Sequence, residues 1–147
     1  MTEPAPEAAR AVSLPHRFPF LLIDRIVELV PGSICVAETA VTGDAFQGAR
    51  PGPLPATLLV EMLCQACGLL GPPPESDATE AMSDGAGWGG RLAALRDVRF
   101  SRPARPGETI TLTVRRLGGF GSASRFAGVA AAAGETLAEG ELILGGR

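Results

Sequence analysis

A nearly apolar segment of fourteen residues, TLLVEMLCQACGLL beginning at Thr57, most strongly limits what this chain can fold into. It falls short of the roughly 20 apolar residues that a membrane span requires, so it is typical of a helix buried inside a globular domain. An apolar helix must be covered by other elements, and the C-terminal part of the sequence supplies strand-like segments for this purpose. At 147 residues, the chain is long enough for one hydrophobic core.

The remaining segments predict strands. IDRIVELV ends at Pro31 and Gly32, and SICVAETAVT follows with alternating apolar and polar residues, so this pair is interpreted as a hairpin. Four further runs are RLAALRDVRF, ETITLTVRRL, SASRFAGVAAAA and ETLAEGELIL, and in the second of them Ile110, Leu112 and Val114 alternate with threonines. The sequence therefore predicts an α+β fold in which an antiparallel sheet curls around one long central helix.

Composition suggests how the chain is divided. Residues 1–13 are rich in Ala, Pro and Glu and are expected to be a loose segment, whereas residues 14–147 form a single domain. Within that domain, residues of about 71–90 have the composition of a mobile loop, and Trp88 is interpreted as its anchor.

Charge excludes some classes of function. The net charge is -3 and there is no basic run, which argues against nucleic-acid binding. The N-terminus carries acidic residues before its first arginine, unlike a signal peptide, and no membrane span is expected. We therefore expect a soluble cytoplasmic protein.

The three cysteines are expected to be structural. Cys35, Cys64 and Cys67 are an odd number in a chain without a secretory signal, so a disulfide framework is not expected. Cys64 and Cys67 form a CxxC inside the predicted helix, without a second pair of ligands. We interpret them as small core residues and expect neither a metal nor a cofactor.

Glu61 is the leading candidate for a catalytic residue. An ionised carboxylate is costly to bury without a partner, so a glutamate inside this apolar segment indicates chemistry rather than stability. Gln65 lies four residues further on, which places both polar side chains on one face of the helix.

Four blocks of the sequence resemble a known family. In order, they are LPHRFPFLLIDRIVELVPG, DAFQG, LLVEMLCQACGLL and LRDVRFSRPARPGE, and they resemble segments of the FabZ-type 3-hydroxyacyl-ACP dehydratases of the hotdog fold. The resemblance covers nearly the whole chain after the first dozen residues. It implies an acyl thioester of ACP or coenzyme A as the ligand, in fatty-acid or related acyl metabolism. It also implies a homodimer or higher homo-oligomer, because the family's sites form between subunits.

The resemblance also reveals a difference at the catalytic loop. In the family, a loop histidine removes the proton α to the thioester and the helix acid protonates the departing hydroxyl. The matching loop here is Gly48-Ala49-Arg50-Pro51, with Ala49 at the histidine position, and the stretch up to Glu61 is two residues shorter than in the family. An arginine cannot replace the base because it stays protonated. Weak or absent dehydration by the chain alone is therefore expected.

The resemblance still implies a thioester-binding apparatus. The backbone N–H groups at the helix start, at Ala56 and Thr57, are suited to a thioester carbonyl. Gly48 and Gln65 are expected beside the substrate. Arg50 either pairs with Glu61 and keeps it ionised or points to solvent.

Four functions remain open from the sequence. The chain is a dehydratase-like subunit that pairs with a histidine-bearing hotdog partner, a hotdog thioesterase in which Glu61 activates water, or a non-catalytic acyl-binding module. In the fourth, it is a slow dehydratase with His16 as its base, although His16 also fits a structural turn.

Arginines recur every third residue through the third predicted strand and the turn after it. Arg96, Arg99, Arg102 and Arg105 could dock an acidic carrier protein. The alternative is that they simply face solvent, since residues three apart on a strand lie on opposite faces.

Overall fold

The computed structural model describes residues 21–42, 52–71 and 91–145, which contain one helix and six strands. The elements, in chain order, are β1 (Arg25–Val30), β2 (Ile34–Ala40), α1 (Ala56–Leu69), β3 (Arg91–Phe100), β4 (Thr109–Phe120), β5 (Ala123–Ala132) and β6 (Glu135–Gly145). Each predicted helix and strand is confirmed. The predicted loose segment 1–13, and the loop 71–90 apart from Gly71, lie outside the described residues.

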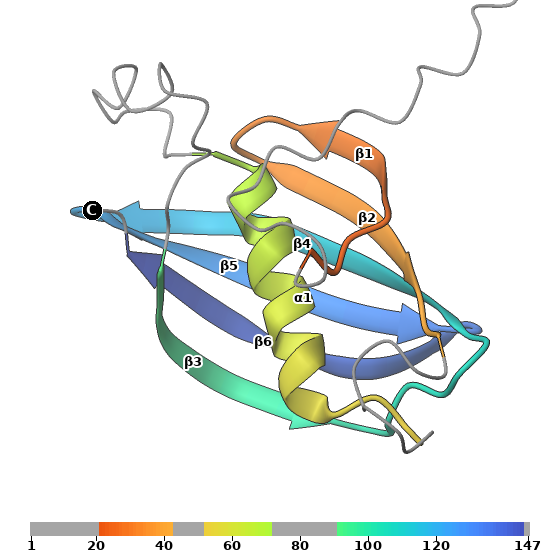
Figure 1. The fold of residues 1–147 in the computed structure, drawn as a ribbon. Helices are drawn as coiled ribbons and strands as arrows, with labels where there is room; N and C mark the ends of the chain where they lie inside the picture. Colours follow the sequence, from red (N-terminus) through yellow and green to blue (C-terminus); the bar gives the residue numbers. More distant parts are fainter. Residues whose placement is uncertain (1–20, 43–51, 72–90, 146–147) are drawn as a thin grey trace, which may run out of the picture.

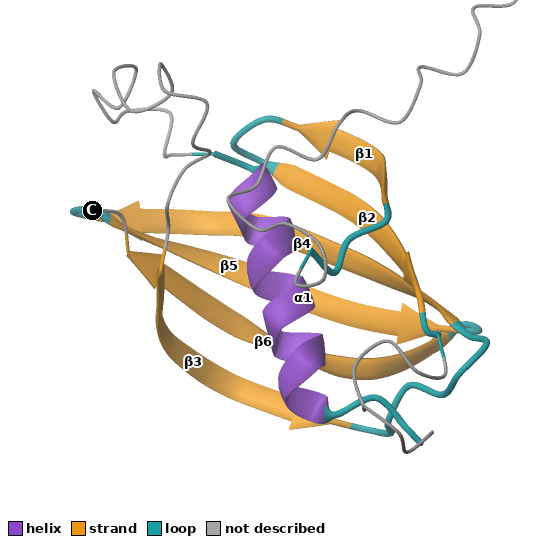
Figure 2. Ribbon diagram, viewed as in Figure 1, coloured by secondary structure: helices purple, strands orange, loops and turns teal. Residues whose placement is uncertain are grey.

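The six strands form one sheet in the order β1-β2-β4-β5-β6-β3, and every neighbouring pair is antiparallel. The sheet curves around α1, which crosses its concave face (Figure 1). Figure 2 shows the same arrangement coloured by secondary structure, with the helix as the filling of the curled sheet. The predicted hotdog fold is confirmed.

The alternation read from the sequence builds the core. Ile110, Leu112 and Val114 on β4 are fully buried beneath the helix, while the threonines between them face outward. On β5, the buried side chain of Phe126 faces the same way. The largest contributions from α1 are Leu59, Met62 and Leu63. Burial of these apolar side chains is the main stabilising term of the domain.

The helix begins differently from the expectation. Pro55, which we expect from the sequence to lie in the first turn, is instead the N-cap residue, with φ -57° and ψ 138°, and no side chain of the described residues caps the helix. This is compatible with proline because its fixed φ suits the extended backbone of an N-cap. The segment before the helix is fixed instead by the Leu54 N–H, which donates to the Ala104 carbonyl over 2.8 Å.

The end of the helix is bonded to two strands. The Gly32 N–H, in the β1–β2 turn, donates to the Leu70 carbonyl over 3.0 Å. The Arg116 guanidinium on β4 donates to the Gly71 carbonyl over 2.6 Å and lies over the Phe126 ring, 5.1 Å from its centroid. Burial lowers the pKa of Arg116 from its ordinary value. These bonds satisfy carbonyls that the end of a helix leaves unpaired.

Among the described strands, β3 is an edge strand, because it pairs with β6 alone and ends the sheet. Leu92, Leu95 and Phe100 on this strand are 44%, 42% and 48% exposed. A long edge strand with exposed apolar side chains is normally covered by another chain or element.

Candidate functional site

Glu61 and Gln65 form a hydrogen-bonded pair on α1, as their spacing predicts. The Gln65 Nε2 donates to Glu61 Oε1 over 3.1 Å. Gln65 is buried, with 1% of its surface exposed, whereas Glu61 is half-buried. The carboxylate therefore reaches the surface of the core while its orienting partner lies inside it.

A backbone group determines which way Gln65 faces. The Leu22 N–H donates to Gln65 Oε1 over 2.9 Å, so the amide oxygen is occupied on that side. The NH₂ group is thereby directed toward Glu61, because an amide has its donor and acceptor on opposite branches. Leu22 itself is 2% exposed, which keeps this backbone donor in place. The pair is thus held by the segment that leads into β1.

The role of Leu22 in this site could not be predicted from side-chain patterns in the sequence. The donor is a main-chain N–H of an ordinary leucine, and a main-chain group leaves no signal in the sequence. The only indication was the buried position predicted for Gln65, since a buried amide needs partners.

The start of α1 presents backbone donors to its surroundings. Ala56 and Thr57 are exposed, and none of the side chains in residues 21–42, 52–71 and 91–145 caps this end of the helix. The next N–H, of Leu58, donates to the Pro55 carbonyl over 3.0 Å. Uncapped N–H groups and the positive end of the helix dipole favour a partial negative charge, such as that on a polarised carbonyl oxygen.

Several predicted site residues lie outside the described residues. These are Gly48, Ala49 and Arg50 of the loop, together with His16. The expected pairing of Arg50 with Glu61, and the roles of the loop residues, therefore remain predictions.

The cysteines lie in or beside the core, as expected. All three are free thiols, and burial raises the pKa of Cys35 to about 11 and that of Cys64 to about 12. Burial also raises the pKa of Cys67 well above its ordinary value. Thiols of this kind are protonated and poor nucleophiles at neutral pH. Within residues 21–42, 52–71 and 91–145, no three Cys, His, Asp or Glu side chains are grouped as metal ligands, and the absence of a metal stays a prediction.

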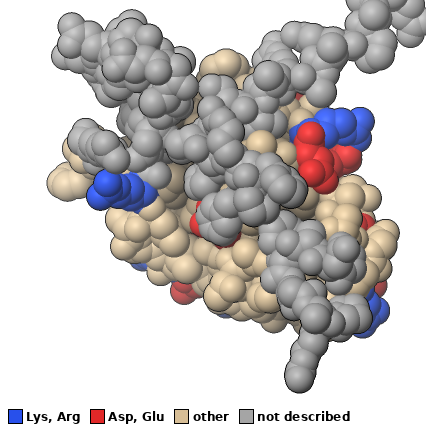
Figure 3. All heavy atoms as spheres, in the orientation of Figure 1, with Lys and Arg blue, Asp and Glu red and all other residues tan. Residues whose placement is uncertain are grey.

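Arg102 is paired within the fold, and the predicted docking role of the four arginines stays a prediction. Its guanidinium contacts Glu108 at 2.8 Å and Glu135 at 2.7 Å, which joins the β3–β4 turn to the start of β6. Hydrogen bonds from Arg102 hold the pKa of Glu108 below its ordinary value. Arg96 and Arg99 pair in register with glutamates of β6. Figure 3 shows acidic and basic side chains interspersed on the described part of one face.

The curled sheet around α1, with the hydrogen-bonded Glu61–Gln65 pair on that helix, defines a protein of the hotdog fold. The sequence profile of the ApeP-like family, described as ApeP dehydratase, matches residues 9–144. The chain belongs to the ApeP-like dehydratase family.

Curated relatives are similar over most of their length. The 3-hydroxyacyl-[acyl-carrier-protein] dehydratase FabZ of Roseiflexus sp. (strain RS-1) is 39% identical over 137 residues, which is 88% of each chain. The FabZ of Enterococcus faecalis (strain ATCC 700802 / V583) is 37% identical over 133 residues, with 88% of this chain and 89% of the relative covered. The resemblance read from the four sequence blocks is confirmed.

Solved structures show the same fold at lower identity. The dehydratase heterocomplex ApeI:P from Xenorhabdus doucetiae matches with a TM-score of 0.73 at 22% identity, covering 92% of this chain and 88% of that chain. Zebrafish thioesterase superfamily member 2 matches with a TM-score of 0.62 at 16% identity, covering 84% and 80%. In the described part of the chain, the helix is neither long nor apolar enough to span a membrane.

Proposed function

We propose that the chain is the acid-bearing subunit of a 3-hydroxyacyl-thioester dehydratase and that a histidine of a partner hotdog subunit is the base. The observation that carries the proposal is the buried Gln65, which binds the Leu22 N–H with one branch and Glu61 with the other. This arrangement orients a carboxylate on the helix even though Ala49 occupies the position of the family's histidine. Because this chain would supply the acid but not the base of the dehydration, a second chain is needed to supply the base.

The reaction removes water from the acyl group. The partner's histidine takes the proton from C2, the electron pair of that C–H bond forms the C2=C3 double bond, and the C3–O bond breaks. The departing hydroxyl takes the proton of the Glu61 carboxyl group and leaves as water, which gives a 2-enoyl thioester. Gln65, which donates to Oε1 of Glu61, orients the carboxyl group for this transfer.

The helix start supplies the second element of the mechanism. As the proton leaves C2, negative charge develops on the thioester oxygen, and the N–H groups of Ala56 and Thr57 are suited to stabilise it. Neither N–H depends on the identity of a side chain. This contribution is therefore compatible with alanine at position 56.

The surface offers a place for the partner. β3 ends the described sheet and has exposed apolar side chains at Leu92, Leu95 and Phe100. A second hotdog chain that pairs along β3 would cover them and continue the sheet. The ApeI:P structure, described as a dehydratase heterocomplex, gives a precedent for two chains of this kind. A second copy of this chain is the alternative occupant, and it would bring no loop histidine.

The substrate and compartment complete the proposal. We place the reaction in the cytoplasm, on 3-hydroxyacyl groups carried by ACP or coenzyme A in fatty-acid or related acyl metabolism. A heterodimer of this type contains one complete site, formed by Glu61 and the partner's histidine. The opposite site lacks its base.

The test is to purify the chain alone and together with a histidine-bearing hotdog protein from the same genome. Both samples are incubated with 3-hydroxyacyl thioesters of several lengths and followed by mass spectrometry. We expect loss of water only from the mixed sample, and a decrease of about 10²- to 10⁴-fold with Glu61→Gln. The exposed Glu28→Gln, on β1 at the opposite edge of the sheet, is the matched control and should leave the rate unchanged.

Other outcomes identify other functions. Release of free acid by the chain alone, abolished by Glu61→Gln, would indicate a thioesterase. Loss of water by the chain alone that requires His16 would indicate a self-sufficient dehydratase. If every Glu61→Gln sample keeps full activity, the proposal is wrong.

A further inference from the structure

A carboxylate at the entry of β1 is bonded to the end of β2. Asp24 directly precedes β1, and its Oδ2 accepts from the Ala40 N–H over 2.7 Å and from the Thr39 hydroxyl over 3.2 Å. The Asp24 N–H donates to the Glu38 carbonyl over 3.0 Å. Asp24 itself lies at the surface, whereas Thr39 is 4% exposed. One surface residue therefore joins the start of β1 to the last residues of β2.

These bonds lie where the pairing of β1 with β2 ends. The last residue pair of this ladder is Arg25 with Glu38. Thr39 and Ala40 lie beyond it, and on their other side they pair with β4. A main-chain N–H at such a position needs an acceptor, and the Asp24 carboxylate supplies it for Ala40. The chain before Asp24 can therefore leave the sheet and run toward α1 (Figure 1).

Leu22, two residues before Asp24, reaches the helix. Its N–H donates to Gln65 Oε1 over 2.9 Å, and Gln65 Nε2 donates to Glu61 Oε1 over 3.1 Å. Leu22 and Ile23 are 2% and 3% exposed, so both side chains are packed in the core. Because two residues of extended chain span at most about 7 Å, the bonds that fix Asp24 also limit where the Leu22 N–H can lie. A continuous set of contacts thus runs from the surface to the candidate acid.

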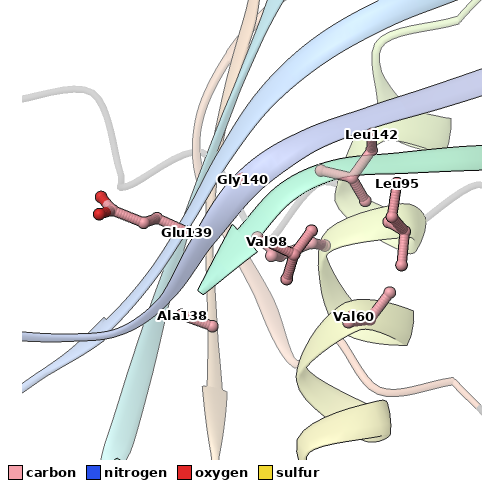
Figure 4. Close-up of a pocket in the computed structure, with 8 residues that line it drawn as sticks. Val60, Leu95, Val98, Ala138, Glu139, Gly140 and Leu142 are labelled. Carbon is pink, nitrogen blue, oxygen red and sulfur yellow. The ribbon is translucent and has the colours of Figure 1, made fainter. Parts of the chain in front are cut away.

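The neighbouring surface of α1 differs, because it contributes hydrocarbon. Val60, which directly precedes Glu61, points into a small apolar hollow that it shares with Val98 of β3 (Figure 4). Glu139 also lines this hollow, but its carboxylate points away from the space. The side chains of the hollow therefore offer Glu61 no polar group that would compete with Gln65.

We propose that Asp24 is a positioning residue for this acid. By bonding the start of β1 to the end of β2, it holds the Leu22 N–H against Gln65 and so fixes the direction of the Glu61 carboxyl group. The inference rests on the proposed function, in which Glu61 is the acid that protonates the departing hydroxyl. Proton transfer depends on the direction of the donor, since a hydrogen bond weakens steeply when it bends. Loss of the Asp24 carboxylate should therefore slow the chemical step and leave substrate binding nearly unchanged.

Amide hydrogen exchange of the purified chain tests the structural link. Exchange is followed by NMR at the N–H of Leu22 and, for comparison, at the N–H of Leu112 on β4, in the interior of the sheet. Asp24→Ala should raise the exchange rate at Leu22 by about tenfold or more relative to Leu112, because hydrogen bonds to a charged group are the stronger kind. The side-chain NH₂ signals of Gln65 should shift in the same variant. A merely structural role would instead raise both exchange rates by a similar factor, because the whole domain would unfold more often.

Three further variants make the exchange result specific. Asp24→Asn retains an acceptor oxygen and should behave like the unaltered chain. Thr39→Val removes the hydroxyl donor with little change in volume, should raise exchange at Leu22 to a smaller extent, and carries the test if Asp24→Ala fails to fold. Glu38→Gln is the matched control, because it removes a carboxylate that pairs with Arg25 across the same two strands and should leave the exchange at Leu22 unchanged.

Kinetics of the mixed sample test the catalytic consequence. With the histidine-bearing partner present, Asp24→Ala should lower kcat for dehydration by about 10- to 10²-fold and change KM by less than about twofold. Asp24→Asn should keep most of the rate, and Glu38→Gln should keep all of it.

Two results would overturn the inference. One is an exchange rate at Leu22 that follows the rate at Leu112 in both Asp24→Ala and Thr39→Val. The other is an unchanged kcat in Asp24→Ala when Glu61→Gln abolishes dehydration, and this result would leave the proposed function standing. Full dehydration by Glu61→Gln would instead remove the proposed function and the positioning role together, whatever the exchange rates are.

Discussion

The two ends of α1 differ in how they are held. At its start, Ala56 and Thr57 are exposed, and in the described part of the chain no side chain caps the helix. At its end, Ala66 and Cys67 are completely buried and Leu70 is 3% exposed. The β1–β2 turn and β4 also donate hydrogen bonds to the carbonyls of Leu70 and Gly71, just after the last helical residue. The helix is thus positioned by its C-terminal end.

Because of this difference, one end of α1 serves mainly stability and the other end is available for ligand binding. The buried end fixes the axis of the helix, and the open start presents its N–H groups where a ligand can reach them. Glu61 lies between the two regions, half-buried, and is linked to the core through Gln65. We therefore expect substitutions at the buried end to change stability and substitutions toward the start to change ligand handling.

The largest effect is expected beneath the buried end. Phe126→Ala removes a fully buried ring that packs under Arg116, and should lower the free energy of unfolding by about 3–5 kcal/mol. Urea denaturation measures this. Phe120→Ala, at a position that is 90% exposed, removes the same atoms from the surface and should change stability by less than about 0.5 kcal/mol. Equal losses in the two variants would contradict the assignment of the core.

A smaller effect is expected at the junction of the two regions. Gln65→Leu removes the acceptor of the buried Leu22 N–H and should lower the free energy of unfolding by about 1–3 kcal/mol. Glu61→Gln retains an oxygen that accepts from Gln65, so its stability should stay within about 1 kcal/mol of the original. Chemical denaturation of both variants checks this. A Glu61→Gln loss as large as that of Gln65→Leu would make Glu61 a structural residue.

The smallest effect depends on pH and concerns the thiols. Burial raises the pKa of Cys64 from its ordinary value near 9 to about 12, so the folded state keeps a proton that the unfolded state loses above pH 9. The stability from the neutral thiol is complete below pH 9 and is lost as the pH rises toward 12. Cys64→Ala should therefore weaken the decline in stability above pH 9, as measured by denaturation at pH 7 and at about pH 10.5. An unchanged decline would show that the thiol is not protected in the fold.

The sequence predicted the elements and the sheet around the helix because periodicity is a local property. The alternation in β4 and the apolar run of α1 were sufficient to assign those elements. The position of β3 at the edge of the sheet, next to β6, depends on pairing between residues that are far apart in the sequence. No local pattern in RLAALRDVRF distinguishes an edge strand from a central one.

The candidate site was predictable only where side chains carry it. Glu61 and Gln65 were found from their polarity within an apolar segment, and their contact follows from the helical spacing. The Leu22 N–H is a backbone feature, so residue types did not reveal it. The pairing of Arg102 with Glu135 joins residues that are far apart in the sequence, so their spacing did not predict it either.

The pairing of β3 with β6 has a consequence for how the chain folds. Strands β4, β5 and β6 follow one another as antiparallel hairpins, so each can pair as soon as the next is available. β3 precedes all three in the sequence but must wait for the last of them. During synthesis, its apolar side chains therefore stay uncovered until residues 138–145 leave the ribosome, and closure of this long loop is expected to be the slow step. An early partner that binds β3 would protect the nascent chain before its own sheet is complete.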